Sequence, residues 1–355
     1  MKNEKFEDLE FLKNFFAPLT SRVYLVGGCV RDEILGIKSK EFDIEVYDIN
    51  PENFDKLMQK LGAKGVGKSF FVYKWKNFDI SLPRTETKTA KGHKGFEVTP
   101  TQNEKTASKR RDFTMNALMK NIYNGKITDF WGGIQDIKNR LIRHIDDKTF
   151  TEDPLRVLRA MQFSARFKFK ISPKTVRLCQ SLNLSELSKE RIFSEFEKMF
   201  KSKYLYMGFY YFITLGIAKK VLNLSFTKKE FFHLAKIYKN NPLESYFLYH
   251  LKYYKSIKTE YLIKRLNLTN NLKRDIKFKK LPKTVTNRFL YALSLKYPLK
   301  TFCILNGKCC EKWIKQENLW QKKYKPKYIN PENPRLSILQ EIKSYDKIII
   351  KKGDI

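Results

Sequence analysis

The chain has 355 residues, 42% of them hydrophobic and 14% aromatic, which is ample for globular folding and excludes global disorder. Its length suggests two to four domains. No apolar run reaches the roughly 20 residues of a membrane span, and the N-terminus mixes acid and base without an apolar signal core. We therefore expect no membrane anchor and a cytoplasmic location.

The formal net charge is +34, and +24 of it lies in residues 201–355, which hold 34 basic and 10 acidic residues. Such a chain attracts polyanions, because each neutralised phosphate releases condensed counterions. A Lys-rich proteome would also tolerate basic surfaces. The regional imbalance favours a nucleic acid as the partner, without distinguishing RNA from DNA.

Helices and strands alternate in the first part of the chain. Residues 4–16 have the apolar spacing of a helix, and Val23–Val26 is a short strand that ends at Gly27-Gly28. The elements predicted next are a helix from about Val30 to Leu35, a strand at Phe42–Tyr47, a helix after Pro51, and strands near Phe70–Trp75 and Asn77–Leu82.

From Asp153 onward the strand signals fade, and residues 153–167 and 188–200 have helical periodicity. The order of elements predicts an α+β fold. A mixed-sheet domain should occupy residues 1–140, and helices should follow at 141–200 and 201–355.

Two carboxylates stand out on the strand predicted at Phe42–Tyr47. Asp43 and Glu45 are two residues apart, so both side chains leave the same face of the strand. Two carboxylates this close repel each other unless a cation lies between them, and Mg²⁺ bound to triphosphate oxygens is such a cation. A solvated edge strand would give the same pattern. Asp79, on a later strand, is either a third carboxylate of this site or an aspartate at a turn.

Gly27-Gly28 follows a strand and begins a helix, which presents bare backbone N–H groups to an anion. Arg31 lies one turn into that helix, where it could contact phosphate. A simple glycine turn with a surface arginine is the alternative interpretation.

Four segments together resemble the motifs of a known family. They are LVGGCVRD, FDIEVYDI, RRDFTMNAL and EDPLRVLRAMQFSARF, in this order, within about residues 20–200. In order and spacing they resemble the bacterial class of tRNA nucleotidyltransferases, the CCA-adding enzymes, and their poly(A) polymerase relatives. The resemblance implies a polymerase beta-like catalytic head (1–140), a helical neck with a base-recognition motif (141–200) and a basic helical body and tail that binds tRNA (201–355).

The resemblance also implies roles for single residues in the head. Gly28, Arg31 and Arg111 would contact the incoming nucleotide, and Asp112 would contact its sugar. Asp43 and Glu45 would hold catalytic Mg²⁺, although the second carboxylate of the family is usually aspartate. Asp79 would be the third carboxylate.

In the neck, the family's base-reading pair falls on Asp153 and Arg156, which would share one face of a helix. A carboxylate can accept from the exocyclic amine that cytosine and adenine share, whereas uracil lacks this amine and would leave buried polar atoms unpaired. Arg159 would be a further nucleotide contact. Gln162 stands where family members often have arginine. Without the family, an Asp–Arg pair at this spacing is more often a surface ion pair.

The implied reaction is attack of the tRNA 3′-hydroxyl on the α-phosphate of CTP or ATP, with release of pyrophosphate. Three alternatives remain open: a poly(A) polymerase, an enzyme restricted to CC or A addition, and a non-catalytic RNA-binding relative. The sequence gives no oligomeric state.

Residues 62–69 (GAKGVGKS) match the P-loop pattern of nucleotide-binding ATPases. That pattern needs a strand before it and a helix after it. Here a helix is predicted before it and a β-rich run after it. We therefore interpret this segment as a connecting loop.

Overall fold

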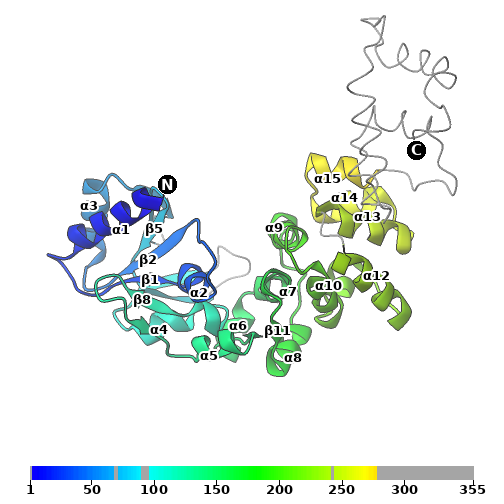
Figure 1. Cartoon of the computed structure of the whole chain (residues 1–355), viewed down its shortest axis with the longest axis horizontal. Helices are drawn as coiled ribbons and strands as arrows, with labels where there is room; N and C mark the ends of the chain where they lie inside the picture. Colours follow the sequence, from blue (N-terminus) through cyan, green and yellow to red (C-terminus); the bar gives the residue numbers. More distant parts are fainter. Residues whose placement is uncertain (1, 68–70, 89–95, 241–243, 278–355) are drawn as a thin grey trace, which may run out of the picture. The chain divides into compact units, whose positions relative to one another are not determined.

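The protein is described from a computed structural model, which places residues 2–67, 71–88, 96–240 and 244–277 (Figure 1). The chain divides into two compact units, Met1–Thr227 and Lys228–Ile355. Among the placed residues, no helix combines the length and the apolar character needed to span a bilayer.

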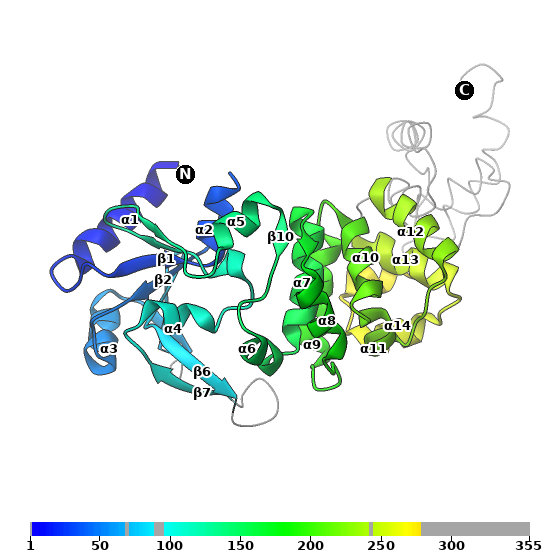
Figure 2. The same cartoon turned by 90° about the horizontal axis from the view of Figure 1, so that it is seen from below.

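A mixed sheet forms the centre of the first unit (Figure 2). Its strand order is β3-β4-β5-β2-β1-β8-β9, in which β2 and β5 pair in parallel and the other neighbours pair antiparallel. The strands are β1 (Val23–Val26), β2 (Phe42–Val46), β3 (Lys64–Gly67), β4 (Val72–Trp75), β5 (Phe78–Ser81), β8 (Met119–Asn121) and β9 (Ile127–Thr128).

Three helices pack on this sheet through apolar side chains. Helix α1 (Lys2–Phe16) stacks Phe11 on Trp75 of β4, with ring centroids 5.4 Å apart. Helix α3 (Pro51–Lys60) begins with Pro51, as predicted, and buries Phe54 against Tyr73. Helix α2 (Gly28–Ile34) packs on β1 and β2. Strands β1 and β2 are consequently buried at the middle of the sheet, which fixes the backbone that carries Asp43.

Short elements connect the sheet to the helical part of this unit. They are the hairpin of β6 (Arg84–Lys88) and β7 (Phe96–Pro100), the parallel pair β10 (Leu141–Ile142) and β11 (Lys170–Ile171), the 3-10 turn η2 (Thr114–Asn116), and helices α4 (Glu104–Lys109), α5 (Gly133–Lys138) and α6 (Asp147–Glu152). Gly133 lies so close to the Thr114 carbonyl that a β-carbon would overlap it. This glycine therefore allows α5 to support η2.

The helical part of the first unit is built around α7 (Leu155–Phe167), which packs on α9 (Lys189–Phe200) and α10 (Leu205–Thr214). A β-carbon at Gly208 of α10 would overlap Met199 and press on Ala165, so the absence of a side chain permits this close packing. Helices α8 (Pro173–Ser181) and α11 (Ile217–Leu222) complete this part.

The placed part of the second unit consists of helices. They are α12 (Lys228–Asn240), α13 (Glu244–Tyr254), α14 (Thr259–Leu266) and α15 (Asn270–Asp275). Buried leucines and a stacked pair, Tyr238 and Phe247, form its core.

The α+β class predicted from the sequence is confirmed, as are the early strands and helices to within about two residues. Two predictions are wrong. Residues 62–69 were expected to form a connecting loop, yet strand β3 lies within them. Helices were expected at 141–200, with strand signals fading from Asp153 onward, yet β11 lies at Lys170–Ile171. Its two residues pair with β10, so pairing to a distant segment stabilises a strand too short to leave a periodic signal. The domain limits 140 and 200 stay predictions.

Candidate nucleotide-binding cleft

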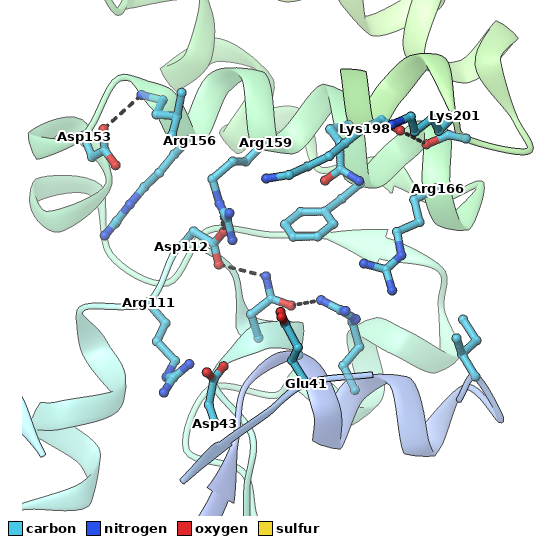
Figure 3. A pocket seen from close by; sticks show the side chains of 18 of the residues that line it. Glu41, Asp43, Arg111, Asp112, Asp153, Arg156, Arg159, Arg166, Lys198 and Lys201 are labelled. Carbon is cyan, nitrogen blue, oxygen red and sulfur yellow. Dashed lines mark hydrogen bonds and ion pairs between the residues drawn. The ribbon is translucent and has the colours of Figure 1, made fainter. Parts of the chain in front are cut away.

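A cleft of about 1040 Å³ lies within the first unit, between the sheet and the helices that follow it (Figure 3). Its walls come from α2, the start of β2, the segment 110–116, helix α7 and the junction of α9 with α10. Of the residues predicted from the sequence, eight line it: Gly28, Arg31, Asp43, Arg111, Asp112, Asp153, Arg156 and Arg159. Glu45 and Asp79 do not.

Gly27 and Gly28 are placed as the sequence predicted, at the step from β1 into α2. Gly27 has a φ of 73°, and a β-carbon there would overlap the Arg111 guanidinium. The missing side chain therefore lets Arg111 lie against this turn. Gly28 is the first residue of α2 and opens onto the cleft.

Arg31 is more enclosed than predicted. Its guanidinium donates to Asp32 Oδ1 at 2.7 and 2.9 Å and to Asn116 Oδ1, and it lies 4.6 Å from the Phe167 ring centroid. Burial lowers its pKa, in spite of the Asp32 charge. Arg31 lines the cleft, but it also ties α2 to η2 and α7.

Asp43 and Glu45 leave the same face of β2 as predicted, but their surroundings differ. Glu45 is 2% exposed, and its Oε1 accepts from Arg110 and Arg111 at 3.0 Å each, while Tyr47 donates to its Oε2 at 3.2 Å. Burial alone would raise the pKa of Glu45, yet the two arginine charges and these hydrogen bonds outweigh burial and lower it. Glu45 is therefore the buried counterion of two arginines, an arrangement that does not support the prediction that it holds a metal.

Asp43 lines the cleft. Loss of water around its carboxylate raises its pKa, and the nearby charge of Asp79 adds to this effect, while Arg111 opposes it. Another acidic residue that lines the cleft is Glu41, which Figure 3 shows beside Asp43. Glu41 also lies two positions from Asp43, on its other side in the sequence. The same spacing rule that selected Glu45 could have found it.

Asp79 on β5 pairs in register with Asp43 on β2, so the two side chains share a face of the sheet. Its Oδ1 is buried and accepts no hydrogen bond from any placed residue. The Lys74 ammonium lies 3.4 Å from this oxygen and 3.7 Å from Glu41 Oε1. The Lys74 ammonium therefore lies between the carboxylates of Glu41 and Asp79, at a position where these two groups attract a cation.

These acidic groups fit a divalent cation in part. Mg²⁺ takes carboxylate oxygens and commonly completes its shell with water and substrate phosphates. Asp43 and Glu41 offer oxygens to the cleft, and Asp79, a strand away, has one that lies 3.4 Å from the Lys74 ammonium. Among the placed residues, no three His, Cys, Asp or Glu side chains form a ready-made metal-holding group. The donors suit a metal completed by a phosphate ligand.

Asp112 is buried, and both of its oxygens are engaged. Oδ1 accepts from the Phe113 amide and Asn116, and Oδ2 accepts from Arg159 Nε at 2.7 Å. Burial alone would raise the pKa of Asp112, but the charge of Arg159 and the bond from Asn116 lower it. Asp112 thus joins the segment 110–116 to α7, beyond the sugar contact that the resemblance implied.

Asp153 and Arg156 both line the cleft, but they do not share a helix. Asp153 lies in extended backbone between α6 and α7, because Pro154 follows it and α7 begins at Leu155. Its carboxylate accepts from the Leu155 amide at 3.1 Å and from Arg191 Nη2 of α9 at 3.1 and 3.2 Å. Arg156 donates to the carbonyls of Thr149 and Arg110.

Arg191 was missed by the sequence reasoning. It lies 38 residues from Asp153, and no local spacing signals that contact. Gln162, which stands where family members often have arginine, is 4% exposed and lines the cleft.

Comparisons with known proteins agree with this geometry. Residues 23–143 match the family described as Poly A polymerase head domain, and residues 168–225 match the Probable RNA and SrmB-binding site of polymerase A. Two segments of the chain therefore resemble parts of poly(A) polymerase-type proteins.

Relatives that this chain resembles include the Multifunctional CCA proteins of Nitrosospira multiformis and Pasteurella multocida. The first is 38% identical over 209 residues, 57% of this chain and 49% of that protein. The second is 42% identical over 188 residues, 50% of this chain and 43% of that protein. The chain therefore spans about half the length of the curated relatives it matches.

Solved structures with the same fold include two CCA-adding enzymes. That of Bacillus stearothermophilus in complex with CTP has a TM-score of 0.74 at 23% identity, covering 91% of this chain and 83% of its own. That of Thermotoga maritima in complex with tRNA has a TM-score of 0.70 at 23% identity, covering 99% and 94%. At this identity the likeness concerns the fold.

The P-loop-like segment has the wrong context for a phosphate-binding loop. Helix α3 precedes it and strand β3 lies within it, whereas a P-loop needs the reverse order. Lys68 and Ser69, its last two residues, lie outside the placed residues.

Proposed function

We propose that the chain is a tRNA nucleotidyltransferase that adds C, C and A to the tRNA 3′ end from CTP and ATP. The observation that carries the proposal is that two pairs of residues line the same cleft. Asp43 and Glu41 lie on one wall, and Asp153 and Arg156 lie on another. A nucleoside triphosphate needs both walls: acidic groups for a metal near its phosphates, and a polar pair for its base.

The residues that would hold Mg²⁺ are Asp43 and Glu41, with Asp79 nearby. When bound, the metal would lower the pKa of the attacking hydroxyl and neutralise the leaving pyrophosphate. In the reaction, the RNA 3′-oxygen forms a bond to the α-phosphorus of the nucleotide, and the bond to the β-phosphate oxygen breaks. Asp79, which shares a face of the sheet with Asp43, is the carboxylate that would take the hydroxyl proton.

Base selection would rest on Asp153 and Arg156. Arg191 and the Leu155 amide hold the Asp153 carboxylate, while two carbonyls hold Arg156, so both groups are oriented before a base arrives. A carboxylate oriented in this way accepts from the amine of cytosine or adenine. Uracil has no such amine, and the lost hydrogen bond would cost about 1–3 kcal/mol.

Hydrogen bonds and ion pairs hold the arginines that line the rest of the cleft. Arg111 is held by Glu45, Arg159 by Asp112, and Arg31 by Asp32 and Asn116, so the arginines are fixed beside the site of reaction. Donors that are already oriented need no rearrangement when phosphate charge develops. Cytoplasmic location, expected from the sequence, stays a prediction.

The proposal is tested by incubating the protein with tRNA transcripts that lack CCA and with each of the four nucleotides, with and without Mg²⁺. Incorporation of CTP and ATP but not UTP or GTP, lost without Mg²⁺ and in Asp43→Asn, is the expected result. Long A tails would identify a poly(A) polymerase. Incorporation of C alone or A alone would identify a partial enzyme.

A further inference from the structure

Gln162 is a buried polar side chain on the wall of the cleft, and its amide has no hydrogen-bonding partner among the placed residues. It lies on α7 and is 4% exposed. A buried amide without a partner is unfavourable in a folded protein, because water no longer solvates it fully. A ligand in the cleft that forms a hydrogen bond with Gln162 would offset this cost.

The charged side chains on either side of Gln162 already have partners. Arg159 donates to Asp112 at 2.7 Å, and Arg166 donates to Asp32 at 2.9 Å. Gln162 comes three residues after Arg159 and four before Arg166, so the three share one face of α7, on which Figure 3 shows the two arginines. This face therefore presents a neutral amide, open to a ligand, between two arginines whose charges are compensated.

The position of Gln162 along α7 suits the sugar of a bound nucleotide. Arg156, of the proposed base-reading pair, lies at the beginning of α7, and Gln162 follows six residues later, about 9 Å further along the helix axis. Asp43 and Glu41, proposed to hold the metal, line another wall of the cleft. The sugar of a nucleotide joins its base to its phosphates, so it lies between the base-reading pair and the metal.

The chemistry of an amide matches a hydroxyl group better than a phosphate. Glutamine has an acceptor oxygen and two N–H donors, and a hydroxyl group likewise both donates and accepts. Ionised phosphate oxygens only accept, and they bind more strongly to the charged side chains nearby. The ribose hydroxyls are therefore the groups of a nucleotide that Gln162 fits, and the 2′-hydroxyl is the one that distinguishes ribose from deoxyribose.

We propose that Gln162 forms a hydrogen bond with a ribose hydroxyl of the incoming CTP or ATP, which makes the sugar a determinant of substrate choice. This inference rests on the proposed nucleotidyl transfer and adds a sugar-reading residue to the base-reading pair. It is separate from the sugar contact expected of Asp112, whose two oxygens are already engaged by protein groups.

The test is Gln162→Met, which keeps the length of the side chain and removes the amide. The matched control is the same substitution at Gln135, which is exposed on α5 and does not line the cleft. Addition of one nucleotide to a tRNA transcript is measured with CTP, 2′-deoxy-CTP and 3′-deoxy-CTP. In Gln162→Met, kcat/KM for CTP should fall about 10-fold, because one hydrogen bond is lost, whereas kcat/KM for one of the two analogues should not change. The control should match the wild type with all three nucleotides.

Two kinetic outcomes would overturn the proposal. An equal loss with all three nucleotides would place Gln162 at the phosphates or the base, and no loss with CTP would remove it from the nucleotide. A loss that disappears only on a transcript ending in a 2′-deoxynucleotide would assign Gln162 to the acceptor strand, which also contradicts the proposal.

Denaturant unfolding without nucleotide tests whether the amide is free. The free energy of unfolding of Gln162→Met should not be lower than that of the wild type, because the amide has no protein partner to lose. A lower value would show that Gln162 already has a structural partner, and the basis of the proposal would be gone.

Direct titration of CTP and the two analogues, with Mg²⁺, onto the wild type and Gln162→Met separates this inference from the proposed function. If the wild type transfers no nucleotide, the proposed function fails. Gln162 is then judged by affinity alone. Weaker binding of CTP to the variant, with unchanged binding of one analogue, supports the inference, and equal affinity of both proteins for CTP would refute it.

Discussion

At the scale of single residues, the cleft separates acidic side chains into two kinds. Asp43 and Glu41 line the cleft, whereas Glu45, on the same face of the same strand, is closed under Arg110 and Arg111. The distinction is one of partners. A carboxylate already held by two guanidinium groups has little left to offer a metal, but it keeps those arginines in place.

Substitutions of these acids should therefore affect different properties: catalysis for Asp43 and Glu41, and stability for Glu45. Asp43→Asn and Glu41→Gln should lower kcat by roughly 10³-fold, because metal binding is lost, with little change in stability. Glu45→Gln removes the buried counterion of two half-buried arginines and should lower the free energy of unfolding by about 3–5 kcal/mol. Rates at several Mg²⁺ concentrations and denaturant unfolding of all three variants make the comparison. A Glu45→Gln protein of normal stability whose activity recovers at high Mg²⁺ would restore Glu45 as a metal ligand.

Base selection can be tested at Asp153 and at the arginine that holds it. Asp153→Ala should reduce the preference for CTP and ATP over UTP and GTP by about 10-fold to 100-fold, since one buried hydrogen bond is worth about 1–3 kcal/mol. Arg191→Met should reduce the same preference by a smaller factor. Arg177→Met, on the exposed side of α8, is the control. An equal loss of rate with all four nucleotides would refute a templating role.

At the scale of elements, ion pairs between a buried aspartate and a partly exposed arginine join segments that are distant in the sequence. Asp112 connects the segment 110–116 to α7 through Arg159, and Asp32 connects α2 to α7 through Arg166. The sequence located α2 and α7 from their periodicity. It could not predict these pairings, because partners 47 and 134 residues apart leave no local pattern.

The Asp112–Arg159 pair should make stability depend on acid pH. The folded-state pKa of Asp112 lies below its usual value, so its stabilisation is complete above about pH 4 and is lost as pH falls through the lower folded pKa. Asp112→Asn should cost roughly 3 kcal/mol at pH 7, and the gap from wild type should narrow below pH 4. Denaturant titrations from pH 7 down to acid check this. A gap that is constant with pH would contradict the assignment.

Helix α5 supports the turn that carries Asn116. Because a β-carbon at Gly133 would overlap the Thr114 carbonyl, Gly133→Ala should displace η2 and lower the free energy of unfolding by about 1–3 kcal/mol. Nucleotide KM should rise too, since Asn116 holds both Arg31 and Asp112. Gln135→Ala, exposed on the same helix, is the control in unfolding and kinetic measurements. If the free energies of unfolding of Gly133→Ala and the control are equal, η2 can shift to accommodate the β-carbon without loss of stability, which would contradict the prediction.

At the scale of the whole molecule, local periodicity and motif order were enough to predict the α+β class and the likeness to the poly(A) polymerase head domain at residues 23–143. The cleft-lining set was largely predictable too, since Gly28, Asp43, Arg111, Asp153 and Arg156 lie in the motifs. The sequence could not predict that Glu41, and not Glu45, lines the cleft beside Asp43. Both glutamates lie two positions from Asp43, and this identical spacing puts all three acids on one face. Only the packing of segment 110–116 against β2 decides which of them faces the cleft.

The central claim is that this cleft adds C, C and A and then stops. The most direct measurement is the product length after incubating the protein and Mg²⁺ with tRNA transcripts that end at the discriminator base, at C and at CC, supplied with CTP and ATP. The account predicts growth by three, two and one nucleotides respectively, followed by arrest. Failure to extend any of the three transcripts would contradict it.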